Sequence, residues 1–110
     1  HVDCIGHPSG RRLGRRSPAE LDLEAIVARA VETGTCLELN GQPERLDLRD
    51  THARLAAEAG ARLVVSSDAH SVEGLGYLDL ALATARRGWV TRETVLNTLP
   101  WERIEGIVTR

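Results

Sequence analysis

Two side chains that can bind a divalent cation, Asp68 and His70, stand one residue apart in the segment Ser66-Ser67-Asp68-Ala69-His70-Ser71. They follow the apolar run Leu63-Val64-Val65, which predicts a buried strand, so they fall where a parallel strand ends and its loop begins. Enzymes of the α/β class keep reactive groups at this position. We interpret both residues as metal ligands, because a sharp bend would turn the carboxylate and the imidazole toward one point. The alternative for an isolated Asp-x-His is a polar turn with an exposed histidine.

Three predicted strands, at residues 2–6, 35–39 and 63–65, alternate with predicted helices. Ser17-Pro18-Ala19-Glu20 is typical of a capped helix start, and Asp47 is placed to cap a second helix. Glycines are expected to end the three long helices, at Gly34, Gly60 and Gly88.

The last third of the chain predicts two more helical segments. A third helix is expected to present the apolar face Leu75, Leu78 and Leu82. A short helix is expected at Thr91 to Leu99, before Pro100.

Alternating strands and helices are typical of right-handed parallel crossovers, so the strands should end at one common edge. His7 follows the first strand in Gly6-His7-Pro8-Ser9-Gly10, and Asn40 ends the second, two residues after Glu38. We therefore predict that His7, Asn40 and the Asp68/His70 pair meet at that edge. No G-x-G-x-x-G segment follows a strand, which disfavours a dinucleotide-binding fold.

The composition and charge of the chain disfavour two classes of protein, uniformly basic nucleic-acid binders and membrane-spanning proteins. A net charge of −2 excludes a uniformly basic nucleic-acid binder, although all 14 basic residues are arginines and a local basic patch stays open. There is no apolar run long enough to span a membrane and no signal-peptide pattern, so we expect a soluble cytoplasmic protein. Several residues are assigned no chemistry. Cys4 and Cys36 are expected to be reduced core cysteines, and Tyr77, Trp89 and Trp101 packing residues. His52 is expected to face solvent, and His1 to lie on the far side of the first strand from His7.

Three motifs resemble the later motifs of the polymerase and histidinol phosphatase (PHP) domain: Gly6-His7-Pro8-Ser9-Gly10-Arg11, Leu37-Glu38-Leu39-Asn40 and Ser67-Asp68-Ala69-His70. The tail from Ala85 to Trp89, with Val95 to Thr98 and Pro100, is similar to the form found in bacterial family X DNA polymerases. The resemblance implies that residues 1–110 are the carboxyl-terminal portion of a single PHP domain. Its fold would be three βα units of a distorted TIM-like (β/α)7 barrel, incomplete as given.

The resemblance also implies a metal site and a reaction. It makes His7, Asp68 and His70 ligands in a cluster of two or three Mn, Zn or Fe ions, with Asp68 and His70 catalytic. The family's other ligands have no counterpart in this chain. The implied activity is hydrolysis of phosphate esters, either 3′-5′ exonuclease or 3′-end processing of DNA, or removal of phosphate from a small molecule. Because ligands are missing, the chain alone should be inactive, and a non-catalytic structural or DNA-interaction module is the competing interpretation.

A basic loop follows the first of these motifs. Arg11 is the candidate for binding the substrate phosphate, with Arg12 or Arg15 on flanking DNA backbone, and the alternative is a solvated basic turn. Glu38 and Asn40 are expected to orient ligands or substrate, the alternatives being a carboxylate paired with arginine and a turn former. Three strands cannot close a barrel, so we expect the missing half of the domain, or a second copy, to cover the exposed strand edges.

Overall fold

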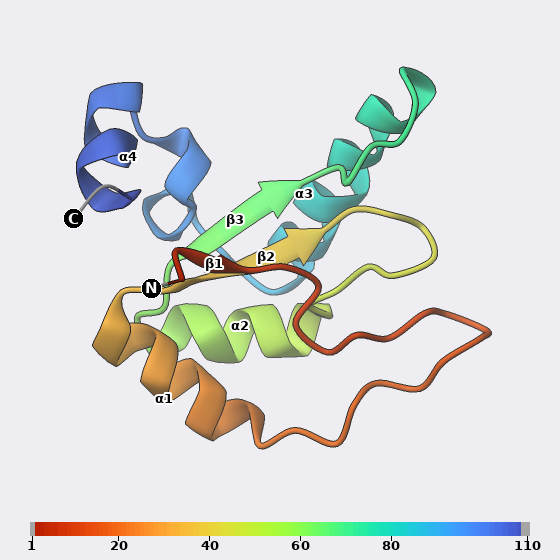
Figure 1. Cartoon of the computed structure of the whole chain (residues 1–110), viewed down its shortest axis with the longest axis horizontal. Helices are drawn as coiled ribbons and strands as arrows, with labels where there is room; N and C mark the ends of the chain where they lie inside the picture. The colour runs from red at the N-terminus through yellow and green to blue at the C-terminus, as the bar shows by residue number, and fades with distance from the viewer. Residues whose placement is uncertain (1, 109–110) are drawn as a thin grey trace.

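Apolar residues at alternate positions of two neighbouring strands direct one face of the sheet into the core, and Cys36 and Asn40 at the two ends of the central strand are buried on the other face. The computed structural model describes residues 2–108. Its strands, β1 (Cys4–Ile5), β2 (Cys36–Asn40) and β3 (Leu63–Ser66), form a parallel sheet in the order β1-β2-β3 (Figure 1). Four α-helices accompany the strands in the described part of the chain: α1 (Leu23–Thr33), α2 (Asp50–Glu58), α3 (Leu78–Arg87) and α4 (Trp101–Val108). The predicted α/β class with a parallel sheet is confirmed.

The core lies between the sheet and the first three helices. Leu37 and Leu39 of β2 are paired in register with Leu63 and Val65 of β3, and all four are buried. They pack against small and apolar residues of α1, α2 and α3, namely Val27, Ala30, Ala53, Ala56, Ala81 and Ala85. Glu38, Val64 and Ser66 have the opposite strand parity and are only half-buried.

This arrangement bears on the barrel prediction. Consecutive parallel strands joined by right-handed crossovers carry their helices on one face of the sheet. A barrel has that arrangement, whereas a doubly wound sheet has helices on both faces. The three strands do not close into a barrel, so membership of a seven-stranded barrel stays a prediction.

Two predicted helix starts are wrong. Helix α1 begins at Leu23, because the Asp22 carboxylate caps it by accepting a hydrogen bond from the Ala25 N–H at 3.1 Å. Ser17 does not cap it; the segment after Ser17 is tied instead to the loop at Ser9, whose carbonyl accepts from the Ala19 N–H at 2.8 Å. Helix α2 begins at Asp50 and Asp47 does not cap it.

The predicted apolar face of the third helix is also wrong. A 3₁₀ helix, η1 (Glu73–Tyr77), precedes α3, and Leu75, Leu78 and Leu82 are all exposed. The buried residues of α3 are small, namely Ala81, Thr84 and Ala85. Small side chains let α3 lie close to α2 and to the sheet, so the leucines lie on the outer side.

The segment expected to be a short helix covers part of the β3 edge. It contains two 3₁₀ turns, η2 (Arg92–Thr94) and η3 (Leu96–Thr98), and Val95 between them is extended and bridges Leu63 in parallel. The Asn97 side chain donates to the Val65 carbonyl at 2.7 Å and accepts from the Val65 N–H at 3.2 Å. The expectation that β3 is a bare edge is therefore wrong along this stretch.

Helix α4 was not predicted, although Pro100 directly before it is a usual helix-starting residue. Among residues 2–108, no helix combines the length and apolarity needed to cross a membrane.

Several residues lie in other environments than predicted. Cys36 is buried but Cys4 is exposed, and both are free thiols. Trp89 and Trp101 are 73% and 63% exposed, so they are not packing residues, although the guanidinium of Arg54 lies 4.3 Å from the centre of the Trp89 ring. His52 is half-buried rather than solvent-facing, and His1 lies outside the described residues.

Candidate functional site

The loops that leave the carboxyl ends of the three strands surround one cavity of about 500 Å³. His7 follows β1, Gln42 follows β2, and Asp68 and His70 follow β3. The residues that line the cavity are His7, Arg12, Gln42, Glu44, Arg45, Asp68 and His70. The predicted meeting of His7 with Asp68 and His70 at one edge of the sheet is thus present. Metal binding by these residues stays a prediction.

The chain bends sharply at two of these positions. His7 and Asp68 have positive φ angles, 28° and 52°. This region costs a residue with a side chain about 1–2 kcal/mol, so surrounding contacts must hold it. Both bends occur directly after a strand and turn the chain toward the cavity.

Glu38 connects the ends of all three strands. Its carboxylate accepts hydrogen bonds from the His7 N–H at 2.6 Å and from the Ser66 hydroxyl. The Asn40 amide nitrogen lies 3.4 Å from both carboxylate oxygens. Because the loop after β1 and the strands β2 and β3 each contribute one partner, Glu38 fixes the relative positions of the loops that carry the candidate ligands.

Asn40 orients the Asp68 carboxylate. It is 2% exposed, and its side-chain amide donates to Asp68 Oδ2 at 3.0 Å while its Oδ1 accepts from the Gln42 N–H at 2.9 Å. Gly41 must be a glycine, since a Cβ atom there would overlap the Tyr77 carbonyl.

The hydrogen bonds of His70 determine which ring nitrogen is free. Its Nδ1 lies 2.8 Å from the Asp68 carbonyl, and a carbonyl only accepts, so Nδ1 carries the hydrogen. The Nε2 nitrogen then has an available lone pair. Histidines that bind metals commonly donate their other N–H to a carbonyl in this way. Gln42 donates to the same Asp68 carbonyl at 2.7 Å.

The donor set suits a transition metal in kind but not in number. Imidazole nitrogens and a carboxylate oxygen are ligands that Zn, Mn and Fe accept. Among residues 2–108, however, no three His, Cys, Asp or Glu side chains are grouped closely enough to hold an ion. The described residues therefore offer an incomplete ligand set.

Asp47 is a site residue that sequence reasoning placed wrongly. It is fully buried, and its carboxylate accepts from the Ser9 N–H and Gly10 N–H, both at 3.0 Å, and from the Ser9 hydroxyl at 2.8 Å. It thereby holds the turn that follows His7. The available signal was its position between Leu46 and Leu48, where a carboxylate must find buried donors.

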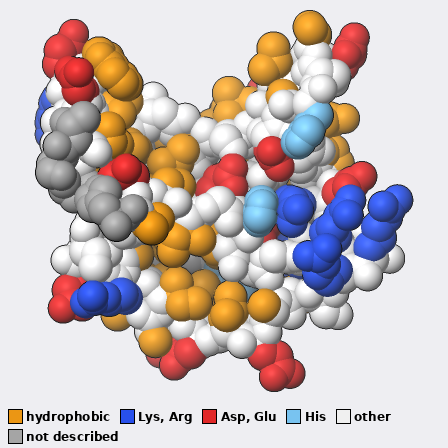
Figure 2. Space-filling view, viewed as in Figure 1, with side chains coloured by type: hydrophobic (Ala, Val, Ile, Leu, Met, Phe, Trp, Pro, Cys, Tyr) orange, Lys and Arg blue, Asp and Glu red, His pale blue; other side chains and the backbone are white. Residues whose placement is uncertain are grey.

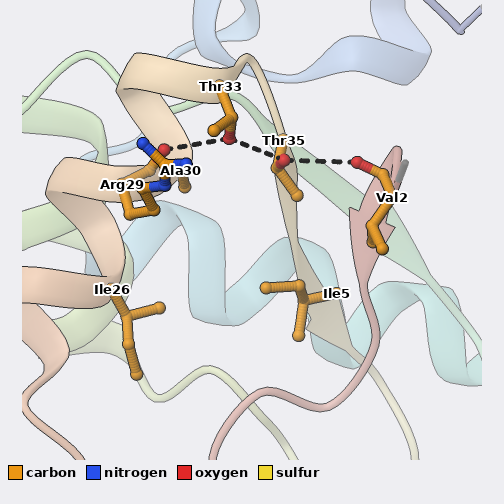
Figure 3. A pocket seen from close by; sticks show the side chains of 7 residues that line it. All are labelled: Val2, Ile5, Ile26, Arg29, Ala30, Thr33 and Thr35. Atoms are coloured by element: carbon orange, nitrogen blue, oxygen red, sulfur yellow. Dashed lines mark hydrogen bonds between the residues drawn. The ribbon is translucent and has the colours of Figure 1, made fainter.

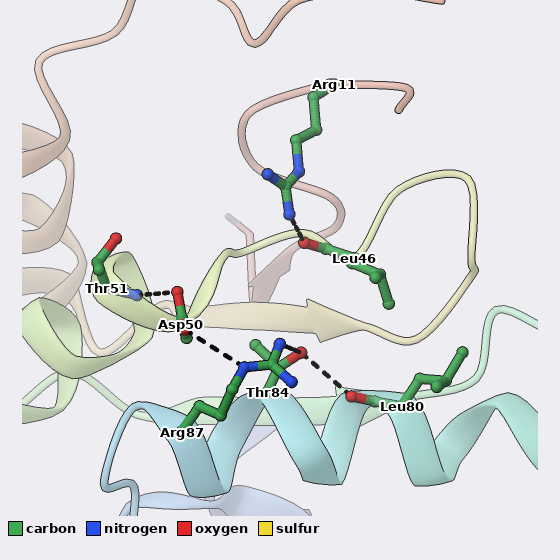
Figure 4. A network of polar contacts seen from close by, with 7 residues as sticks. All are labelled: Arg11, Leu46, Asp50, Thr51, Leu80, Thr84 and Arg87. Atoms are coloured by element: carbon green, nitrogen blue, oxygen red, sulfur yellow. Dashed lines mark hydrogen bonds and ion pairs between the residues drawn. The ribbon is translucent and has the colours of Figure 1, made fainter. Parts of the chain in front are cut away.

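The basic loop is bound to the loop after β2. Arg11 donates from Nε to the Arg45 carbonyl at 2.8 Å and from Nη2 to the Leu46 carbonyl (Figure 4). Desolvation, followed by the charge of Arg49, lowers the pKa of Arg11 from its usual value. Arg12 pairs with Glu44, and this hydrogen bond lowers the pKa of the Glu44 carboxyl. Figure 2 shows a group of basic side chains on the right of the view, next to histidines.

A second cavity, of about 560 Å³, lies between β1 and α1 (Figure 3). Its lining includes Val2, Ile5 and Ile26, and the Thr35 hydroxyl donates to the Val2 carbonyl at 3.2 Å. The lining contains no His, Cys, Asp or Glu, so we assign it no chemistry.

Comparison with known proteins finds two kinds of relative. The whole chain is 42% identical to part of the DNA polymerase/3′-5′ exonuclease PolX of Bacillus subtilis (strain 168), and it covers 19% of that protein. It is 31% identical, over 99% of its length, to a probable phosphatase of Shewanella sp. (strain ANA-3), of which it covers 43%. It is 29% identical, over 89% of its length, to a probable phosphatase of Thermoanaerobacter sp. (strain X514), of which it covers 40%. No family model matches the chain.

Proposed function

We propose that the chain carries part of the active site of a metal-dependent phosphoesterase of the PHP type. The observation that carries the proposal is the single cavity lined by His7, Asp68, His70 and Arg12. It places potential metal ligands beside a cation that can bind a phosphate group.

The relatives support the same reaction class. Their names describe a DNA polymerase with 3′-5′ exonuclease activity and probable phosphatases, and both activities hydrolyse phosphate esters. The chain spans less than half of each of these relatives, so we propose that it is the carboxyl-terminal portion of a PHP domain whose other strands and ligands lie in a longer protein. Those strands would complete a barrel beside the open edge of β1.

Each residue of the site then has a role. His7, Asp68 and His70 would hold two or three Mn, Zn or Fe ions together with ligands outside these 110 residues. Bound ions of this kind lower the pKa of a water molecule and stabilise charge on a phosphate. Asn40 and Glu38 orient the ligands through the contacts to Asp68 and to the His7 N–H. Arg11, the first candidate for binding the phosphate, donates to carbonyl groups of the loop after β2, so in this proposal it anchors the basic loop. Arg12 lines the cavity and binds the phosphate.

The preferred substrate is the 3′ end of DNA, because the PolX relative matches the entire chain at the higher identity. A small phosphomonoester is the second candidate, favoured by the probable phosphatases.

The test is metal content, measured by elemental analysis on the longest natural polypeptide that contains these residues. Asp68→Asn and His7→Ala should each lose bound metal and 3′-end hydrolysis. Asp79→Asn, a matched change at an exposed position on α3, should retain both. Full metal occupancy in Asp68→Asn would remove Asp68 from the ligands. If the longer polypeptide contains no metal and binds DNA as tightly without added metal as with it, the structural-module interpretation would replace the enzyme interpretation.

A further inference from the structure

Two guanidinium groups in the cavity have donors without partners. Arg12 Nε and Arg45 Nη1 are buried, and neither makes a hydrogen bond. A buried donor without a partner costs about 1–3 kcal/mol, and such groups are rare in folded proteins. Both arginines line the cavity that contains His7, Asp68 and His70. Both donors are closed off from solvent in this conformation, so an anion in the cavity would reach them once the two side chains turn toward it.

The backbone that carries the two arginines is firmly held. The Leu13 N–H donates to the Glu44 carbonyl at 2.5 Å, and the Arg45 N–H donates to the Gln42 carbonyl at 2.8 Å. The Arg45 carbonyl accepts from Arg11, and Asp47 binds the turn at Ser9. Residues about thirty positions apart in sequence are thus fixed side by side, which limits the entropy lost when both side chains bind one ligand.

We propose that Arg45 and Arg12 form a clamp for a phosphate group of the substrate, and that Glu44 occupies Arg12 until the phosphate arrives. The inference rests on the proposed function and deepens it by assigning Arg45, which the sequence did not suggest, to substrate recognition. Guanidinium groups suit this task because their planar donors match the oxygens of a phosphate.

The Glu44 carboxylate can separate readily from Arg12. Its side chain is 55% exposed, while that of Arg12 is 31% exposed, so the carboxylate can turn into water when a competing anion binds. An exposed ion pair contributes little stability and is readily exchanged. Glu44 therefore acts as an internal competitor for the phosphate.

The test measures binding of inorganic phosphate and pyrophosphate to the chain in the presence of a metal chelator, by titration of the arginine Nε–H signals in NMR spectra. Arg12 and Arg45 signals should shift together. Arg45→Gln and Arg12→Gln should each weaken binding about tenfold, because each removes charge-assisted hydrogen bonds. Glu44→Gln should tighten binding, since Arg12 loses its competitor. Arg45→Lys, which retains the charge but not the fork, should give an intermediate affinity and keeps the test informative if Arg45→Gln does not fold.

Arg16→Gln is the control, because Arg16 belongs to the same basic loop but does not line this cavity. Equal weakening by Arg16→Gln and Arg45→Gln would reduce the effect to general attraction and overturn the clamp. Weaker binding in Glu44→Gln would overturn the role of Glu44. Because the chelator removes metal, a protein that binds phosphate but never metal would refute the proposed function and leave the clamp intact. A protein that binds metal but not phosphate would refute the clamp and leave the proposed function intact.

Discussion

Two carboxylates near the cavity, Asp47 and Glu44, differ in what they contribute because they differ in burial. Glu44 is exposed and pairs with Arg12, and an ion pair so open to water contributes little to stability. Asp47 has no contact with water and satisfies three donors of the turn after His7. The buried carboxylate, and not the ion pair, should therefore determine whether His7 is held in place.

Asp47→Asn tests this conclusion. The three donors of Ser9 and Gly10 bond to Asp47 Oδ2, and the Ser9 N–H also lies 3.2 Å from Oδ1. An asparagine keeps one accepting oxygen, but its NH₂ group replaces the other oxygen and the remaining hydrogen bonds lose their charge assistance, so we expect a loss of about 1–3 kcal/mol in the free energy of unfolding. Urea denaturation measures it. The exposed Asp79→Asn should cost less than about 1 kcal/mol. Equal effects of the two substitutions would show that Asp47 does not hold the turn.

The Cys4 thiol should react slowly although its side chain is partly open to solvent. Desolvation, followed by the charges of Cys36, Glu38 and Asp3, raises the pKa of Cys4 to about 11. The reactive thiolate is then scarce below that pH. Alkylation followed by mass spectrometry should be slow at pH 8 and should accelerate up to about pH 11. Urea-unfolded protein is the control, and fast labelling of folded protein with an apparent pKa near the ordinary ~8.5 would contradict the prediction.

Single residues were predictable where their chemistry is local. Asp68 and His70 follow a strongly apolar strand, so their place at its end could be read directly from the sequence. Asp47 and Arg45 have partners more than 30 residues away, in the turn after His7 and in the basic loop. The residues next to Asp47 and Arg45 in the sequence do not indicate these partners. A contact pattern of that kind depends on how two loops pack, which spacing alone does not encode.

At the scale of elements, the strands were predicted more reliably than the helix starts. Apolar runs define β2 and β3, whereas several residues compete to cap a helix. Ser17 begins a good capping sequence, but Asp22 caps α1 because residues 17–22 are drawn toward the turn at Ser9. The alanine face of α3 was missed because leucines dominate the apolar pattern, although small residues are what close packing against α2 requires.

Asn97 replaces a strand at the outer edge of β3. Its amide satisfies both the N–H and the carbonyl of Val65, as a neighbouring strand would. Asn97→Ala should therefore lower the free energy of unfolding by about 1–3 kcal/mol, since two backbone groups lose their partner. Asn97→Asp should be at least as destabilising as Asn97→Ala, because it keeps the acceptor for the Val65 N–H but sets a carboxylate oxygen against the Val65 carbonyl. Thermal denaturation measures both variants, and a stability unchanged in Asn97→Ala would show that water or another group satisfies Val65.

At the scale of the molecule, one face of the sheet is covered by helices, and the edge formed by β1 is exposed. Leu37 and Leu39 of the central strand are completely buried, while both residues of β1 are exposed. The cavity beside Ile5 is apolar. The buried face follows from the helices lying on one side of the sheet. The wider barrel was implied by the resemblance to the PHP domain, and three strands do not establish it.

Amide hydrogen exchange tests which protein, if any, covers that edge. In the monomer, the amides of Leu37 and Leu39 should exchange slowest, because opening them requires unfolding of the core. The amides of Cys4 and Ile5 should exchange fastest among the strands. A second copy that pairs with β1 would protect these two amides more strongly as protein concentration rises. Further strands of the same domain would protect them only in a longer polypeptide, independently of concentration. Protection of β1 equal to that of β2 in the dilute 110-residue chain would contradict the open edge itself.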